Sequence, residues 1–465
     1  MPAVNQIAKY AVDLSFEKIP AEVQHAAKRL LADAVCCAAA GWDRHSTMVT
    51  RQVFPGVTGP LQASVWGDGT QAWVPAAAFV NGTMVREPEI NDTFTDKTPG
   101  HPSEAIPAII ALCEALERSG KELMSGIVAA YEIYARLCKS ATLVGSDRGW
   151  HHTTYGIVVV PAVGAKCLGF DQAKAENAIA ISASYGVTLN QLHLGDTSGL
   201  RSVVFPMAAF TGVISCFLAD EGLTGPPAVL DGPHGFYPQL FGDDYDLSVL
   251  NDWSEPLILK TSIKLFGCSY YIHTALEAFK EVIEENQLGE TDIERVVVEL
   301  TRRPFEVVAQ KSRVKPETIE AADHSLTFCM GLLATRGTVY PHDFTEETLN
   351  DAQVLGFAKK IEIKVNEDLD REYPLQRARP AIVSVYTRDG LAGTARSIFP
   401  RGDYREPLSD DQLFGKFCDL TTAWYNRDQA QQVWDAIFAL DGCDNIRTFI
   451  EQLLPRPAVR SPEKI

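Results

Sequence analysis

The chain of 465 residues has a formal net charge of −18, and 46% of its residues are hydrophobic. This length favours two or three domains, or one large domain with an insertion, and the apolar fraction allows a large core. The negative charge argues against nucleic acid and anionic membranes as partners, although a local basic pocket can still bind a small acid. Because the sequence shows no basic leader and no apolar run of about 20 residues, we expect a cytoplasmic protein without a membrane span.

The first 225 residues have the pattern of a mostly helical protein. Apolar residues from Val23 to Ala38 recur at helical steps and draw one apolar face, and Gly41 can end this helix. Cys36 and Cys37 lie in this segment, and we interpret them as small core residues. Further helices are expected over residues 103–116, 126–139, 171–184 and 205–218.

Strand patterns appear after about Leu257. Strands are expected over residues 293–300 and 360–365, and a hairpin over residues 382–386 and 394–399 around an Asp389-Gly390 turn. Helices are expected over residues 271–286 and 325–335, and the helical pattern returns after Ser409. The predicted fold is therefore an α-helical main domain built from both chain ends, residues 1–258 and 403–465, with an inserted α+β lid domain over residues 259–402. The cleft between them is the natural substrate site.

Familiar cofactor and metal motifs are missing from the sequence. It contains no phosphate-binding loop, dinucleotide fingerprint, zinc-protease helix, paired C-x-x-C or serine-hydrolase elbow. None of the ten cysteines forms a C-x-x-C pair, which favours reduced thiols. We therefore expect ordinary acid–base side chains to carry the chemistry, with no metal and no cofactor.

The densest polar segment runs from Glu87 to His101, between two expected helices. A carboxylate such as Asp92 beside a histidine can set the tautomer of the ring and tune its pKa. Polar residues on such a loop are well placed for catalysis. A solvated loop with helix caps at Asp92, Thr93 and Ser103 explains the same composition. Composition alone leaves both interpretations open.

Two adjacent histidines, His151 and His152, precede an apolar segment. They could bind a metal, act as acid–base groups or cap a helix. Because adjacent side chains point in different directions, joint metal binding has poor geometry. Acid–base chemistry, substrate hydrogen bonding, capping and packing stay open.

Two basic positions complete the candidate site. Arg201 is an isolated cation among small and apolar residues, and its planar fork matches a carboxylate. A structural pair with Asp196 competes with that interpretation. Lys264 and His273 lie where the helical part meets the mixed part, which favours a position in the cleft.

In their order and spacing these segments resemble the MmgE/PrpD family, which contains 2-methylcitrate dehydratases, cis-aconitate decarboxylases and iminodisuccinate epimerases. The resemblance covers nearly the whole chain and implies a helical domain from both chain ends, an inserted lid, a homodimer and no metal or organic cofactor. The segments that carry it are Ile19–Val23, Lys28–Asp33, Asn91–Thr93, Gly100–Ser103, Gly149–His151, Thr274–Ala278 and Asp323–Leu326.

The resemblance also implies which residues form the active site. Three positions depart from the family pattern: Glu89 is often Asp, Arg201 is often Lys, and Phe328 lacks a hydroxyl that decarboxylating members use. The expected catalytic residues are His101, Asp92, His152 and Lys264. The expected substrate-binding residues are Glu89, Asn91, Thr93, His151, Arg201 and His273.

The expected function is a lyase that removes water from a small hydroxy-di- or tricarboxylic acid. His101 and His152 would serve as base and acid, with Asp92 orienting or tuning one of them. Arg201 and Lys264 would neutralise substrate carboxylates. The alternatives are an isomerase or epimerase, a decarboxylase, which Phe328 makes less favoured, and a carboxylate-binding protein without turnover.

Overall fold

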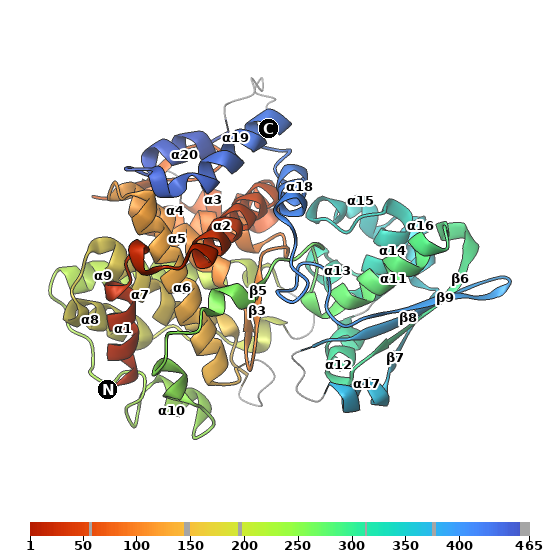
Figure 1. The fold of residues 1–465 in the computed structure, drawn as a ribbon, viewed down its shortest axis with the longest axis horizontal. Coiled ribbons are helices and arrows are strands. Elements are labelled where there is room, and N and C mark those ends of the chain that lie inside the picture. The colour runs from red at the N-terminus through yellow and green to blue at the C-terminus, as the bar shows by residue number, and fades with distance from the viewer. Residues whose placement is uncertain (55–57, 144–148, 194–197, 312–313, 374–377, 456–465) are drawn as a thin grey trace.

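Buried hydrophobic residues form two clusters in the computed structural model, which describes residues 1–54, 58–143, 149–193, 198–311, 314–373 and 378–455. The first cluster combines residues between Ala3 and Ile263 with residues between Leu408 and Leu453. The second lies between Phe266 and Ala395. Figure 1 shows the two corresponding lobes side by side, and we call them the helical lobe and the mixed lobe.

The helical lobe contains helices from both parts of the chain. From the first part come α1 (Ala3–Asp13), α2 (Ala21–Gly41), α3 (His45–Val53), α4 (Val74–Arg86), α5 (Ile106–Ala115), α6 (Gly120–Ser140), α7 (Gly156–Leu168), α8 (Gln172–Ala183), α9 (Val204–Asp220) and α10 (Phe236–Phe241). From the second part come α18 (Asp410–Leu420), α19 (Arg427–Phe438) and α20 (Arg447–Leu453). Both α18 and α19 pack against α2, so the two chain ends share one core. A short hairpin of β1 (Gln62–Ser64) and β2 (Gln71–Trp73) contacts α4.

The helices predicted from periodicity are confirmed. The first long helix ends at Gly41 as expected, and α8 and α9 match their predicted ranges closely. Helix α6 begins six residues before its predicted start because Ser119 and Glu122 form a capping box. The Glu122 carboxylate accepts from the Ser119 backbone N–H at 2.8 Å, while the Ser119 hydroxyl accepts from the Glu122 backbone N–H at 3.3 Å. Helix α5 is preceded by a 3-10 turn, η2 (Pro102–Ala105).

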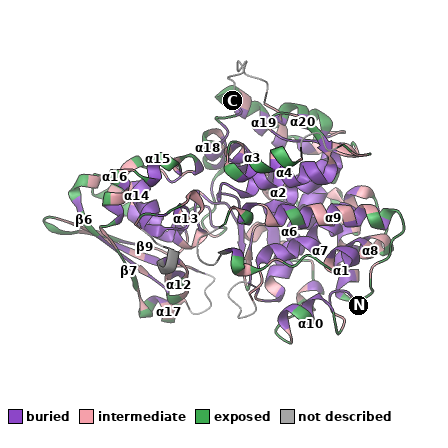
Figure 2. Ribbon diagram, turned by 180° about the vertical axis from the view of Figure 1, so that it is seen from behind, coloured by how far each residue is buried: buried purple, intermediate pink, exposed green. Residues whose placement is uncertain are grey.

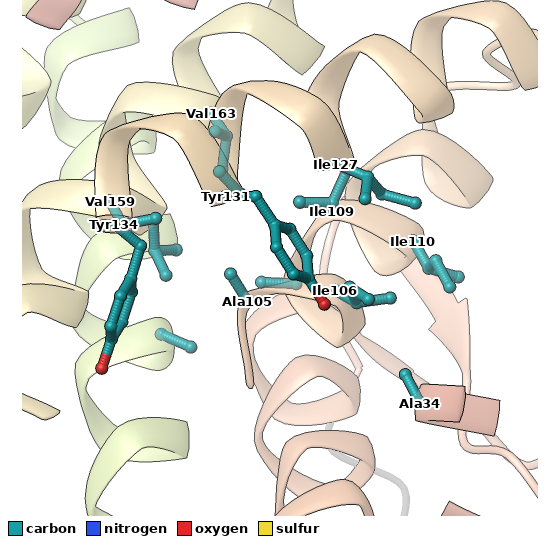
Figure 3. Packing of buried hydrophobic residues seen from close by; sticks show 14 of the residues in the cluster. Ala34, Ala105, Ile106, Ile109, Ile110, Ile127, Tyr131, Tyr134, Val159 and Val163 are labelled. Carbon is teal, nitrogen blue, oxygen red and sulfur yellow. The ribbon is translucent and has the colours of Figure 1, made fainter. Parts of the chain in front are cut away.

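Close helix packing makes the helical lobe dense. At Gly212 of α9, an added Cβ would lie 2.9 Å from atoms of Val160 and Pro161 in α7, so glycine permits this approach. Tyr131 of α6 and Ile109 of α5 lie in the same packed region (Figure 3). Figure 2 shows that α2, α6 and α7 are buried over most of their length.

The mixed lobe contains a four-stranded sheet with strand order β7-β6-β8-β9. Strand β6 pairs with β7 in parallel and with β8 antiparallel, and β8 and β9 form an antiparallel hairpin. Its strands are β6 (Ile293–Leu300), β7 (Ile361–Val365), β8 (Ala381–Thr387) and β9 (Gly390–Ser397). Its helices are α11 (His273–Glu285), α12 (Arg302–Lys311), α13 (Ile319–Ala322), α14 (Leu326–Arg336), α15 (Glu346–Leu349), α16 (Ala352–Ala358) and α17 (Glu367–Glu372). Helix α11 packs on β8 and β9 (Figure 1).

The predicted strands and hairpin are confirmed, but the position of the turn was wrong by one residue. Thr387 pairs with Gly390, so Arg388 and Asp389 form the loop and Gly390 is the first residue of β9. Gly390 has a φ of 115°, a conformation that glycine adopts without a steric cost. Strand β7 alternates half-buried and exposed residues, as its sequence pattern predicts.

The fold is thus a mainly helical part combined with an α+β part. Cys36 and Cys37 have no exposed surface, which confirms them as core residues, and all ten cysteines are unpaired thiols. None of the helices in the described ranges combines the length and apolar character that a membrane span requires. The domain boundaries after residues 258 and 402 stay a prediction.

Candidate active site

A small sheet pairs the polar loop that follows α4 with the segment around Thr261–Ser262, which leads into the mixed lobe. Strand β3 (Thr93–Thr95) pairs with β4 (Pro99–Gly100) and with β5 (Thr261–Ser262), three short strands that the sequence patterns did not predict. Lys264 follows β5 by two residues, so this pairing places its ammonium group at the loop. Lys264 Nζ lies 3.2 Å from Oε1 of Glu89 and 3.0 Å from the Glu89 main-chain oxygen.

Glu89 is the centre of a buried group of charges. Its φ is 53°, in the left-handed region that residues other than glycine adopt rarely and at an energetic cost. Its carboxylate accepts from Lys264 and from Arg86, and Arg201 Nη1 donates to Oε2 at 2.6 Å. All four side chains are buried. Three of the predicted site residues, Glu89, Arg201 and Lys264, therefore lie in direct contact.

Arg201 also joins the two lobes. Its Nη2 donates to Oδ2 of Asp323 at 2.5 Å, and the other Asp323 oxygen contacts Nδ1 of His324. Asp323 and His324 belong to the mixed lobe, just before α14, and were not among the predicted site residues. The Asp323–Leu326 segment was one signal that could have found them. The competing pair of Arg201 with Asp196 falls outside the described residues.

The cations and carboxylates of this group shift one another's pKa values. Burial alone would raise the pKa of Glu89, but the charges of Arg86, Lys264 and Arg201 hold it well below its usual range. Burial alone would lower the pKa of Arg201, but Asp323 and Glu89 raise it. Glu89 is therefore a carboxylate at neutral pH, and Arg201 is a cation.

His101 is a neutral imidazole at neutral pH. Its Nδ1 lies 2.6 Å from the main-chain oxygen of Asp92. Because a carbonyl oxygen only accepts, Nδ1 carries the proton and Nε2 of the neutral ring is unprotonated. Burial lowers the pKa of His101 well below its usual value, and the positive charges of Lys264 and Arg86 lower it further. The residue as a whole is half-buried. This is the state that a general base requires.

The Asp92 carboxyl group accepts hydrogen bonds from Ser103 and Tyr131. Its Oδ1 accepts from the Ser103 hydroxyl at 2.6 Å and from the Ser103 backbone N–H at 3.2 Å, and its Oδ2 accepts from Tyr131 at 2.6 Å. Burial raises the pKa of Asp92 to about 7, although these hydrogen bonds oppose the rise. We expected the carboxylate of Asp92 to orient or tune a histidine. The contact that Asp92 makes with His101 is instead made by its main-chain oxygen.

Raising the pH from about 4 to about 7 should destabilise the protein through Asp92. Its folded-state pKa of about 7 exceeds its ordinary value of 3.8, so over this interval the folded state keeps a proton that the unfolded state loses. Stability therefore falls as pH rises. We expect the unfolding free energy of Asp92→Asn, measured by urea denaturation, to fall less steeply with pH than that of wild type. Identical slopes in the two proteins would contradict this assignment.

The two adjacent histidines make different contacts. His152 Nδ1 lies 3.0 Å from the Tyr134 hydroxyl, and its ring lies 5.1 Å from the ring of His101 between centroids. His151 caps the short helix η3 (His152–Tyr155), since its Nδ1 accepts from the Thr153 backbone N–H. The structure therefore brings His152 together with His101, while His151 makes the capping contact that was one of the interpretations left open.

Asn91, Thr93 and His273 lie in the same region. The Asn91 amide donates to the Ser103 hydroxyl at 3.2 Å, and Thr93 donates to the Gly100 carbonyl at 3.5 Å. His273 is fully buried, with Nε2 3.3 Å from the Cys268 carbonyl. Burial, then the charge of Lys264, lowers the pKa of His273 to about 3, so this ring is neutral at neutral pH.

Two further buried groups at this loop were missed by the sequence analysis. Glu104 Oε1 lies 2.9 Å from Arg86 Nε. Burial raises the pKa of Glu104 to about 8, although Arg86 opposes the rise. Lys416 of α18 donates to Asp33 Oδ1 at 2.5 Å and to the main-chain oxygen of Ile90 at 3.1 Å. No local pattern predicts a contact between residues so far apart in the chain.

Elsewhere in the described ranges, two features could be mistaken for a functional site. Asp33, Cys36 and Cys37 place possible metal-ligand atoms within 4.8 Å of one another, but the Lys416 ammonium competes for the Asp33 carboxylate. A cavity of about 990 Å³ lies between α19 and α20 and is lined by none of the predicted site residues.

The family of the chain follows from its sequence matches. Residues 5–248 match the MmgE/PrpD N-terminal domain, and residues 266–441 match the MmgE/PrpD C-terminal domain. The chain belongs to the MmgE/PrpD family. The second match includes α18 and α19, although the hydrophobic residues of these helices pack in the helical lobe.

The similar proteins include enzymes with two different activities. A cis-aconitate decarboxylase from Aspergillus terreus is 23% identical over 98% of this chain and 96% of its own length. The Homo sapiens cis-aconitate decarboxylase is 26% identical over 93% of this chain and 91% of its own length. A 2-methylcitrate dehydratase from Salmonella typhimurium is 25% identical over 73% of each chain.

Proposed function

We propose that the protein is a lyase that removes water from a small hydroxy-di- or tricarboxylic acid without a metal or organic cofactor. The observation that carries this proposal is the neutral His101 imidazole, held by the Asp92 carbonyl in the field of Lys264 and Arg86. A neutral base beside buried cations suits removal of a proton next to a carboxylate. The names of the relatives, which are a dehydratase and decarboxylases, support an enzyme of this class.

In the proposed elimination, Nε2 of His101 removes a proton from the carbon next to a carboxylate. The electron pair of that C–H bond forms the double bond, and the C–O bond to the neighbouring hydroxyl breaks. His152, with its Nδ1 at the Tyr134 hydroxyl, protonates the leaving oxygen so that it departs as water. Arg201 and Lys264 stabilise the negative charge that develops on the carboxylate.

Access to the charged group requires the lobes to separate. Arg201 is 1% exposed and Lys264 is 0% exposed, and Asp323 of the mixed lobe contacts Arg201. We therefore propose that residues 259–402 act as a lid. The other substrate-binding residues that we propose are Glu89, Asn91, Thr93, His151 and His273.

The experiment that tests the function incubates the protein with citrate-like, aconitate-like and aspartate-like acids in D₂O with a chelator. Loss of water, deuterium incorporation with inversion, and release of CO₂ are distinct outcomes by NMR. We expect loss of water from a hydroxy acid. Ligand-induced stabilisation without turnover on any of these acids would contradict a lyase and favour a binding protein.

Decarboxylation is the second candidate, because the decarboxylases match a larger share of this chain than the Salmonella dehydratase does. In that reaction the C–C bond to a carboxylate breaks, CO₂ leaves, and an acid such as His152 returns a proton to the carbon. Phe328 still makes it the weaker candidate. Its side chain is fully buried in the mixed lobe beside Phe344 and supplies no hydroxyl.

We also propose a homodimer. Exposed apolar side chains gather where α3 meets the 3-10 helix η5 (Gly199–Ser202), and α9 continues from η5. A second copy would bury this face. Light scattering should give about twice the 51.0 kDa chain mass, and a monomer mass would contradict the dimer. The exposed residues are Met48, Val49, Val53, Leu200 and Met207.

A further inference from the structure

The Glu89 carboxylate is surrounded by three cationic side chains. Arg86, Arg201 and Lys264 all donate to its two oxygens, and the group is buried. Several cations that converge on one carboxylate are the usual way in which proteins recognise carboxylate ligands. In this chain a carboxylate of the protein itself shares these cations with any carboxylate of a ligand.

The position of Glu89 is fixed at both ends. Its main-chain oxygen accepts from Lys264 at 3.0 Å, and its side chain accepts from the same ammonium group at 3.2 Å. The left-handed φ of 53° turns the residue into this contact despite its steric cost. Moving the carboxylate aside for a ligand would break its contacts with three cations at once.

The charges in direct contact nearly balance. Arg86, Arg201 and Lys264 supply three positive charges, and Glu89 and Asp323 supply two negative charges. Glu104 also contacts Arg86 and counts as uncharged because burial raises its pKa to about 8, so one positive charge is left. Buried charges are costly unless they are compensated. One added carboxylate therefore completes the balance, a second leaves one excess negative charge beside Glu89, and a third leaves two, so binding should weaken with each carboxylate beyond the first.

Within the described ranges, the charged groups around this cluster do not provide a further unpaired cation for a second or third ligand carboxylate. Arg44 interacts electrostatically with Glu87 and with Asp323, and Lys416 forms an ion pair with Asp33. The pKa of Glu104 is raised to about 8, and this group is mainly uncharged at neutral pH. Ionising it to meet a ligand would add another negative charge.

We propose that Glu89 is a built-in carboxylate that makes the site selective for dicarboxylates over tricarboxylates. This inference rests on the proposed function, in which the same cations hold the carboxylates of the substrate. It narrows the substrate to a small hydroxydicarboxylic acid, in contrast to the citrate- and aconitate-type acids in the names of the relatives.

The test compares two unreactive probes that differ by one carboxylate, glutarate and propane-1,2,3-tricarboxylate. Isothermal titration calorimetry should show that wild type binds glutarate at least about tenfold more tightly. Glu89→Gln keeps the size of the side chain and removes its charge. In this variant the preference should shift at least about tenfold toward the tricarboxylate, because one buried negative charge is gone.

Glu132→Gln is the matched control, since Glu132 is a buried carboxylate paired with Arg136 outside this group, and its preference should equal that of wild type. Glu89→Asp, which withdraws the carboxylate by one methylene, should shift the preference in the same direction as Glu89→Gln by a smaller factor. An unchanged preference in Glu89→Asp contradicts the inference even if Glu89→Gln does not fold. Equal binding of both probes to wild type also contradicts it, whereas binding of neither probe contradicts the proposed carboxylate site itself.

Discussion

Replacing His101 by glutamine is expected to lower kcat about 10²- to 10⁴-fold on the substrate of this protein, with little effect on folding. The glutamine amide can still donate to the Asp92 main-chain oxygen, which His101 contacts at 2.6 Å. It cannot accept a proton from carbon. Stopped-time assays of product, together with urea denaturation of both proteins, separate the loss of chemistry from a loss of fold.

The pH profile provides a second test of His101. Burial, then the charges of Lys264 and Arg86, lowers its pKa, so the ring stays neutral at pH values where an ordinary histidine is protonated. We therefore expect the acid limb of the pH–activity profile of wild type to lie below pH 6.5, so that the enzyme stays active there. His342→Gln is the control, because His342 has an exposed side chain and lies outside the site. Near-normal turnover in His101→Gln would show that another group is the base.

Replacing Lys416 by methionine is expected to lower the free energy of unfolding by about 3–5 kcal/mol, the usual cost of removing one partner of a buried ion pair. Lys416 and Asp33 are both buried, and the ammonium group also holds the main-chain oxygen of Ile90, next to Glu89. The variant therefore loses the connection between α18 and the active-site loop, and kcat should fall as well. Urea denaturation and a turnover assay measure the two effects.

The pH dependence of stability in the Lys416→Met variant should identify the unpaired Asp33 carboxyl group as the cause of the lost stability. Burial raises the pKa of Asp33 and Lys416 opposes that rise, so without Lys416 the folded-state pKa rises further. The folded variant then holds a proton that the unfolded chain has lost. The loss of unfolding free energy relative to wild type should therefore grow as pH rises above about 4. Lys9→Met, at an exposed pair with Asp13, should change stability by less than about 0.5 kcal/mol. A similarly small change in Lys416→Met would contradict a structural role for this pair.

The parts of the fold that follow from local patterns could be predicted from the sequence. The apolar spacing from Val23 to Ala38 is a property of one helix, and the alternation in β7 is a property of one half-buried strand. The combination of a mainly helical part with an α+β part followed from such elements. The short strands β3 and β5 could not be predicted, because they are two or three residues long and exist only through their pairing.

The candidate site was predictable in its residue types and segments but not in its contacts. The polar loop, the histidine pair, Arg201 and Lys264 are visible in the sequence, and the contact of Glu89 with Arg201 and Lys264 is a product of tertiary structure. Asp323 reaches Arg201 across 122 positions of sequence. The left-handed conformation of Glu89 was equally invisible, since non-glycine residues give no local signal for it.

The central claim is that His101 removes a proton next to a carboxylate that is held by buried cations. The most direct measurement is the loss of the C–H signal beside the carboxylate of malate and citrate in D₂O, followed by proton NMR with wild type and with His101→Gln. We expect wild type to remove this hydrogen as the unsaturated acid appears, and the variant to do so about 10²- to 10⁴-fold more slowly. Folded wild-type protein that binds these acids but leaves the hydrogen in place would contradict the claim.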